Sequence, residues 1–157
     1  MSKRPIEILI VEDNPGDVRL IRESLSDTET QHRLHVARDG EEALAYLHQE
    51  GEFAGAPRPE LIILDLNLPT KNGHEVLAVI KSSAQFKFIP VVILTSSNLD
   101  EDILKAYAHN ANCYVTKSVD PMEATRLLGA IRDFWLTSAR LPVPLPLGIH
   151  SDLSSPT

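Results

Sequence analysis

The sequence predicts an α/β domain with a doubly wound, five-stranded parallel sheet and helices on both faces. One observation is that short β-branched runs alternate five times with helical patterns, which is typical of consecutive βα units with right-handed crossovers. Another is that three of these runs are almost wholly apolar, as in strands that helices cover on both sides. The chain has 157 residues, 43% of them hydrophobic, which is enough for the core of one domain.

Five runs have the length and side-chain content of strands. They cover residues 7–11, 34–37, 61–64, 91–94 and 113–116. The last of these runs, residues 113–116, shows the strand pattern most weakly.

The first two helices are predicted from their capping residues. Asn14 precedes Pro15, and proline is favoured at the first helical position. Asp39 has Glu42 three residues later, which is the spacing of a capping box. Apolar residues then recur every three or four positions, and they are Val18, Ile21 and Leu25 in the first helix and Ala43, Leu44 and Leu47 in the second.

The third and fourth helices show the same signal. Asn72 has Glu75 three residues later, and Asn98 has Glu101, so we expect helices to start near Asn72 and Asn98. Their apolar positions are Val76, Leu77 and Ile80 in the third helix and Ile103, Leu104 and Tyr107 in the fourth.

The fifth helix is predicted to begin at Asp120 and Pro121 and carries a regular apolar stripe, formed by Leu127, Leu128, Ile131, Phe134 and Trp135. The periodicity then stops, so the domain is expected to cover residues 1–136. Prolines alternate with leucine and valine soon afterwards, which excludes a helix. We therefore expect residues 137–157 to form an extended or partly disordered arm.

Composition excludes several classes of function. The chain has 22 acidic and 15 basic residues, and a net charge of −7 argues against nucleic-acid binding. Cys113 is the only cysteine, so neither an intrachain disulfide nor a thiolate zinc site is expected. No apolar stretch approaches the roughly 18 residues of a membrane span. We expect a cytoplasmic location, because a signal peptide is also absent.

Polar residues follow four of the predicted strands, and in an open parallel sheet this edge binds ligands. They are Glu12, Asp13, Asp65, Asn67, Thr95 and Lys117. Three carboxylates in one place need a positive counter-charge, and oxygen ligands with room for water suit Mg²⁺. Asp65 ends the central strand and is the candidate for a covalent phosphoryl acceptor. Lys117 is a compact positive charge for a phosphoryl group, and the Thr95 hydroxyl could bond the same group.

Four segments together, residues 11–14, 64–73, 94–96 and 114–117, resemble the receiver domain of two-component response regulators. The resemblance covers about residues 6–135. It implies a flavodoxin-like fold with strand order 2-1-3-4-5. Residues 111–118 and the short extension after the last helix resemble the stand-alone regulators that partner bacterial phytochrome kinases, so a light-signalling pathway is expected.

The resemblance implies a role for each matching residue. Asp65 would accept a phosphoryl group from a phosphohistidine of a sensor histidine kinase. Asp13, and Glu12 partly through water, would bind Mg²⁺ together with Asp65 and the Asn67 carbonyl. Lys117 would contact the phosphoryl oxygens.

Thr95 would be the switch hydroxyl, and Tyr114 the aromatic side chain that swings inward when Thr95 moves. Such a protein is not an enzyme with a separate substrate, although it catalyses its own phosphorylation and dephosphorylation. Its output would pass through a protein partner.

One position departs from the family pattern. Most receivers have a proline after the lysine, often in a cis bond, whereas Ser118 follows Lys117 here. A cis bond before another residue costs about 3 kcal/mol. The geometry of the Lys117–Ser118 bond therefore stays open at this point.

Phe134 and Trp135 indicate a surface for self-association. Two adjacent aromatic residues cannot both point fully inward from one helix face. The exposed remainder and the apolar arm together favour a partner surface. We expect a homodimer through the fifth helix and the arm, as in the related phytochrome-linked regulators.

Three alternatives compete with the receiver interpretation. The first is a Mg²⁺-dependent aspartyl-phosphate phosphatase of the haloacid dehalogenase type, although its second aspartate would be Asn67 and its motif follows the first strand. The second is a flavodoxin-like cofactor binder, but Glu12 and Asp13 would repel phosphate from the first loop. The third is a binding module that works without phosphorylation.

Overall fold

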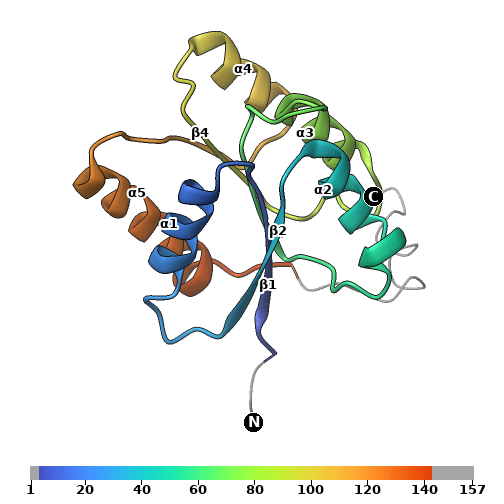
Figure 1. Ribbon diagram of the computed structural model, residues 1–157, viewed down its shortest axis with the longest axis horizontal. Coiled ribbons are helices and arrows are strands. Elements are labelled where there is room, and N and C mark those ends of the chain that lie inside the picture. The colour runs from blue at the N-terminus through green and yellow to red at the C-terminus, as the bar shows by residue number, and fades with distance from the viewer. Residues whose placement is uncertain (1–3, 143–157) are drawn as a thin grey trace, which may run out of the picture.

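The structure is a computed structural model that describes residues 4–142. Its five strands form one parallel sheet in the order β2-β1-β3-β4-β5, which confirms the predicted fold class and strand order (Figure 1). The strands are β1 (Ile6–Val11), β2 (His32–Ala37), β3 (Leu61–Leu64), β4 (Val91–Thr95) and β5 (Cys113–Thr116).

Helices cover both faces of the sheet (Figure 1). One face carries α1 (Pro15–Leu25) and α5 (Pro121–Asp133), and the other carries α2 (Gly40–Leu47), α3 (Gly73–Ser82) and α4 (Asp100–Ala108). Successive strand residues point to opposite faces, so each central strand contributes to two cores. Ile8 and Ile10 pack against the α1–α5 side, whereas Leu9 and Val11 pack against the α2–α3 side.

The capping residues predicted for three helices are confirmed. The side-chain oxygen of Asn14 accepts a hydrogen bond from the backbone nitrogen of Asp17 at 3.1 Å. Asp39 accepts in the same way from the backbone nitrogen of Glu42 at 2.7 Å, and Asn72 accepts from the backbone nitrogen of Glu75 at 3.0 Å. Each cap satisfies a backbone donor that the first helical turn leaves free.

Helix α4 begins at Asp100, near Asn98 as predicted, but Asn98 is not its capping residue: the N-cap is Leu99, which offers no side-chain acceptor. The Ser97 hydroxyl oxygen instead accepts from the backbone nitrogen of Leu99 at 3.4 Å. The predicted inward face is also wrong in part: Leu104 is 71% exposed and Ala106 makes the buried contact. Hydrophobic spacing indicates an amphipathic helix, but it does not show how far the sheet extends beneath it.

The chain stays helical beyond α5, through a π-helical turn at Phe134–Ser138. Leu136 is buried and Trp135 packs partly on the α1–α5 core, whereas Phe134 is 53% exposed. Leu141 also packs on this core. Residues 143–157, which are most of the predicted arm, lie outside the described residues, so the division of the chain at residue 136 stays a prediction. Within residues 4–142, no helix has the length and apolar character to span a bilayer.

Candidate functional site

The carboxyl ends of β1, β3, β4 and β5 lie at one edge of the sheet. After β1 the chain crosses to β2 on one side, and after β3 it crosses to β4 on the other side. In parallel α/β sheets this switch point is the usual ligand site. The structure brings the six predicted site residues to this edge, and they are Glu12, Asp13, Asp65, Asn67, Thr95 and Lys117.

Three carboxylates form an acidic cluster at this edge. Glu12, Asp13 and Asp65 each place a carboxylate oxygen within 4.8 Å of the others. Glu12 and Asp65 are buried, whereas Asp13 is exposed. An oxygen-only donor set that faces solvent on one side fits a hard divalent cation that keeps part of its water shell.

Asp65 is held by bonds to both of its carboxylate oxygens. The backbone nitrogen of Asn67 donates to Oδ1 at 3.0 Å, and Lys117 Nζ lies 2.9 Å from Oδ2. The loop that follows doubles back on Asp65 at Gly73, where a Cβ would stand 2.3 Å from the Asp65 carbonyl oxygen. Only glycine permits this approach of the helix α3 start to the acidic residue.

Lys117 contacts three carboxylates. Its ammonium lies 2.6 Å from Glu12 Oε1, 2.8 Å from Asp17 Oδ2 and 2.9 Å from Asp65 Oδ2. Sequence reasoning did not identify Asp17, because an acidic residue in a first helical turn has an ordinary explanation in the helix dipole. The sequence did offer one indication of its role, because Asp17 follows Asp13 by about one helical turn and could therefore lie near the acidic cluster.

Burial and charge shift the pKa values of this cluster. Burial raises the pKa of Glu12 to about 7; the charge of Asp65 adds to this, and the hydrogen bond from Lys117 opposes it. Burial by itself would lower the pKa of Lys117, but hydrogen bonds to Asp17, Glu12 and Asp65 outweigh it and raise that pKa. The lysine is therefore a firmly protonated cation among acids.

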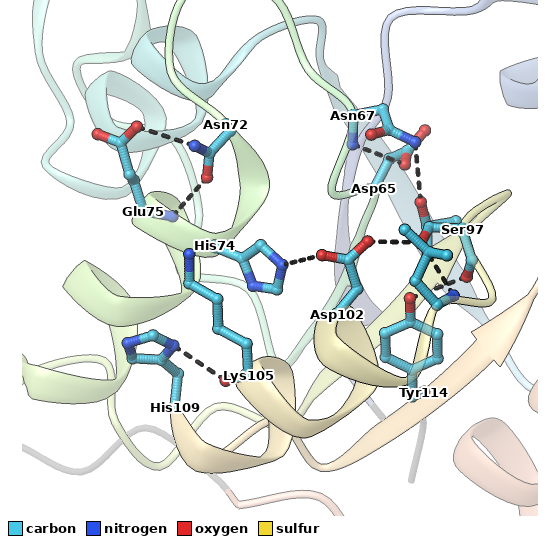
Figure 2. A network of polar contacts seen from close by, with 12 residues as sticks. Asp65, Asn67, Asn72, His74, Glu75, Ser97, Asp102, Lys105, His109 and Tyr114 are labelled. Atoms are coloured by element: carbon cyan, nitrogen blue, oxygen red, sulfur yellow. Dashed lines mark hydrogen bonds and ion pairs between the residues drawn. The ribbon is translucent and has the colours of Figure 1, made fainter.

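The two predicted switch residues lie beside the cluster. Thr95 is fully buried at the end of β4, and the Asn67 side-chain amide nitrogen lies 3.4 Å from its hydroxyl oxygen. The Tyr114 hydroxyl donates to the carbonyl oxygen of Ser97 at 2.9 Å, as Figure 2 shows. Burial raises the pKa of Tyr114. Tyr114 is thus tied to the β4–α4 loop that begins directly after Thr95.

A polar chain continues from this loop to α3 (Figure 2). The Ser97 hydroxyl donates to Asp102 Oδ2 at 2.6 Å, and His74 Nε2 lies 3.2 Å from Asp102 Oδ1. The hydrogen bonds from Ser97 and His74 lower the pKa of Asp102. His74 is buried. Its Nδ1 has no hydrogen-bond partner, and among the described residues it is the one buried side-chain nitrogen or oxygen in this situation. Sequence reasoning gave His74 no role, since no spacing connects it with Asp102.

The Lys117–Ser118 peptide bond is trans, because the described residues contain no cis bond. The backbone nitrogen of Lys117 donates to the Thr95 carbonyl oxygen at 2.7 Å. This bond holds the start of the lysine loop against the end of β4 without the proline that is usual in receivers.

Comparison with known proteins decides the family. The family model described as the response regulator receiver domain matches residues 8–130. The chain belongs to the response regulator receiver family. This receiver is 45% identical over 141 residues to the response regulator Rcp1 of Synechocystis sp., covering 90% of this chain and 96% of Rcp1.

Solved structures of related receivers match the fold. The crystal structure of the phosphorylated cyanobacterial phytochrome response regulator RcpA has a TM-score of 0.86 and 48% identity, covering 89% of this receiver and all of that chain. The Mn²⁺-bound form of Rcp1 has a TM-score of 0.87 and 45% identity, covering 88% of this receiver and all of that chain.

Proposed function

We propose that this chain is a single-domain response regulator whose Asp65 accepts a phosphoryl group from the phosphohistidine of a sensor histidine kinase. The observation that carries the proposal is the arrangement around Asp65, where a protonated lysine lies 2.9 Å from Oδ2 and two more carboxylates lie beside it. This places an acceptor oxygen, a cation for the phosphoryl charge and a candidate metal site within a few ångströms.

The transfer forms a bond from an Asp65 oxygen to phosphorus as the bond from phosphorus to the kinase histidine nitrogen breaks. Lys117 neutralises charge on the phosphoryl oxygens, and the backbone nitrogen of Asn67 orients the Asp65 carboxylate. Glu12, Asp13, Asp65 and the Asn67 carbonyl are the proposed ligands of Mg²⁺. When bound, the cation supplies the remaining positive charge that this acidic cluster and a phosphoryl group require.

The proposed switch is a population shift between two states of the β4–α4 loop. The Thr95 hydroxyl would bond a phosphoryl oxygen on Asp65 in the active state, and the Tyr114 ring would swing inward as Thr95 moves. In the structure the Tyr114 ring is partly buried against the core on the α2–α3 side, and its hydroxyl donates to the Ser97 carbonyl oxygen, which is the inward arrangement.

Similarity to Rcp1 and RcpA supports a phytochrome-linked light pathway, with a phytochrome-type histidine kinase as the donor and a protein partner as the target. We also place the regulator in the cytoplasm, because a chain whose only cysteine is Cys113 suits a reducing compartment. We also propose a homodimer through α5 and the arm, because Phe134 stands half exposed beside the partly buried Trp135, with ring centroids 5.0 Å apart.

A test on the full chain separates this function from the phosphatase and the constitutive binding module. The chain is incubated with acetyl phosphate, and separately with p-nitrophenyl phosphate, each with Mg²⁺ and with a chelator. The proposal predicts one Mg²⁺-dependent phosphoryl adduct and no sustained release of p-nitrophenol. Steady turnover would favour the phosphatase, and the absence of any adduct would favour the binding module.

A further inference from the structure

Asp17 brings a third carboxylate to Lys117, beside those of Glu12 and Asp65. Its Oδ2 lies 2.8 Å from Nζ, and its backbone nitrogen donates to the Asn14 cap at 3.1 Å. The turn that carries Asp17 is therefore fixed by the cap at the start of α1. The Asp17 side chain is 38% exposed, so it approaches the ammonium from the solvent side.

The ammonium of lysine has three hydrogens to donate. In this structure three carboxylates, those of Glu12, Asp17 and Asp65, take one each. A phosphoryl oxygen on Asp65 can reach Lys117 only if one of these partners gives up its bond. Glu12 and Asp65 belong to the acidic cluster, whereas Asp17 lies outside it. Asp17 is the partner that remains when the other two turn to a cation and a phosphoryl group.

We propose that Asp17 is a positioning residue for phosphoryl transfer, because it holds the Lys117 ammonium in place opposite Asp65. This inference rests on the proposed function, in which Asp65 is the acceptor. The lysine side chain is flexible, and fixing its four-carbon stem costs conformational entropy. If Asp17 stays bonded to Lys117 throughout the transfer, the lysine side chain is already ordered before the phosphodonor arrives. The site is then preorganised for the reaction.

Considered only as a charge, Asp17 would be expected to slow phosphorylation of Asp65, which is the opposite of the effect that positioning predicts. Asp17 is a negative charge close to the place where an anionic phosphodonor must enter, so by charge alone its removal would speed the reaction. Positioning requires that its removal slows the reaction. The direction of the change therefore distinguishes the two.

The experiment follows adduct formation on the full chain by intact-protein mass, with Mg²⁺ and increasing acetyl phosphate. The variants are Asp17→Ala, Asp17→Asn and, as a matched control, Glu23→Gln, which removes an exposed carboxylate of α1 that pairs with Arg19. We expect the maximal rate to fall about threefold to tenfold in Asp17→Ala, with the half-saturating acetyl phosphate concentration unchanged. Asp17→Asn keeps an oxygen acceptor and is expected to be intermediate, and Glu23→Gln to match the wild type.

A second readout reports the lysine itself. Hydrogen exchange of the Lys117 ammonium, followed by its ¹⁵N signal in the protein without phosphodonor, is expected to be faster in Asp17→Ala than in Glu23→Gln. Wild-type rates in both Asp17 variants, or faster ones, would overturn the inference and leave the proposed function standing. No adduct on the wild-type chain would overturn the proposed function itself, and the inference with it. If Asp17→Ala fails to fold, Asp17→Asn decides the question.

Discussion

The imidazole of His74 at the start of α3 lies 3.2 Å from the carboxylate of Asp102 in the first turns of α4. The contact joins two helices that lie on either side of β4 in the chain. Asp102 also accepts a hydrogen bond from the Ser97 hydroxyl. It therefore connects α3, which follows the Asp65 loop and carries His74, with the β4–α4 loop that carries Ser97. The position of α4 is therefore fixed by polar contacts more than by apolar burial, since its single buried residue is Ala106.

His74→Ala is expected to lower the free energy of unfolding by about 1–3 kcal/mol, because it removes a buried hydrogen-bonding side chain and leaves space beside Asp102. Urea unfolding of the full chain measures the change. His109→Ala is the matched control, since that imidazole bonds only the carbonyl of Lys105 in its own helix (Figure 2). Equal effects of the two substitutions would contradict the role assigned to the α3–α4 contact.

Asp102 also predicts a dependence of stability on acid. Its pKa in the folded protein is lower than the ordinary value of 3.8, so the folded state holds fewer protons on this group than the unfolded chain. The stability that this group contributes is complete above its ordinary pKa and is lost as the pH falls through the lowered value.

Asp102→Asn should therefore flatten the acid limb of unfolding free energy below about pH 4. Asp100→Asn, two residues earlier in the first turn of α4, serves as the control because Asp100 is exposed and outside the network. An acid limb that is the same in Asp102→Asn and the wild type would show that the bonds from Ser97 and His74 carry no net stability.

Gly73→Ala is expected to destabilise the fold by about 1–3 kcal/mol and to slow phosphoryl acceptance. The added methyl group would meet the Asp65 carbonyl oxygen at 2.3 Å and backbone of Leu66 at 2.5 Å, so the loop must move. At Gly129 in α5 the same change meets only the flexible end of Arg132 at 3.4 Å. Gly129→Ala should therefore be neutral or stabilising, by up to about 1 kcal/mol from helix propensity. Similar losses at both positions in thermal unfolding would refute the packing argument.

Phe134→Ala is expected to weaken the proposed homodimer about tenfold or more, because the half-exposed ring would lose its burial at the interface. Sedimentation velocity of the full chain over a micromolar concentration series measures the association. Phe88→Ala removes a ring of similar exposure, 50%, from the α3–β4 loop and should leave association unchanged. A wild-type chain that stays monomeric with and without phosphorylation would rule out the dimer.

Local chemistry made much of the fold predictable. The caps at Asn14, Asp39 and Asn72 depend on residues three positions apart, and the apolar strands depend on neighbours in sequence. The turn that leads into α4 was not predictable in this way, because Ser97, whose hydroxyl accepts from the Leu99 backbone nitrogen, is held by contacts with Asp102 and Tyr114.

The predicted site residues converge because strand ends meet at one edge, which topology alone requires. Asp17 and His74 were missed for a common reason: each acts through a partner that only the folded chain brings near. Lys117 lies 100 residues from Asp17, and Asp102 lies 28 residues from His74. No local pattern marks such pairs, whereas the motif around Asp65 carries its own signal.

The central claim is that Asp65 accepts a phosphoryl group with the help of a divalent cation, and intact-protein mass after incubation with acetyl phosphate tests it most directly. Samples contain Mg²⁺ or a chelator and use the wild type, Asp65→Asn and the control Asp27→Asn, which changes an exposed carboxylate near Arg132. We predict one phosphoryl adduct on the wild type and on Asp27→Asn, only with Mg²⁺, and none on Asp65→Asn. An adduct that persists in Asp65→Asn, or that forms equally well with the chelator, would contradict the account.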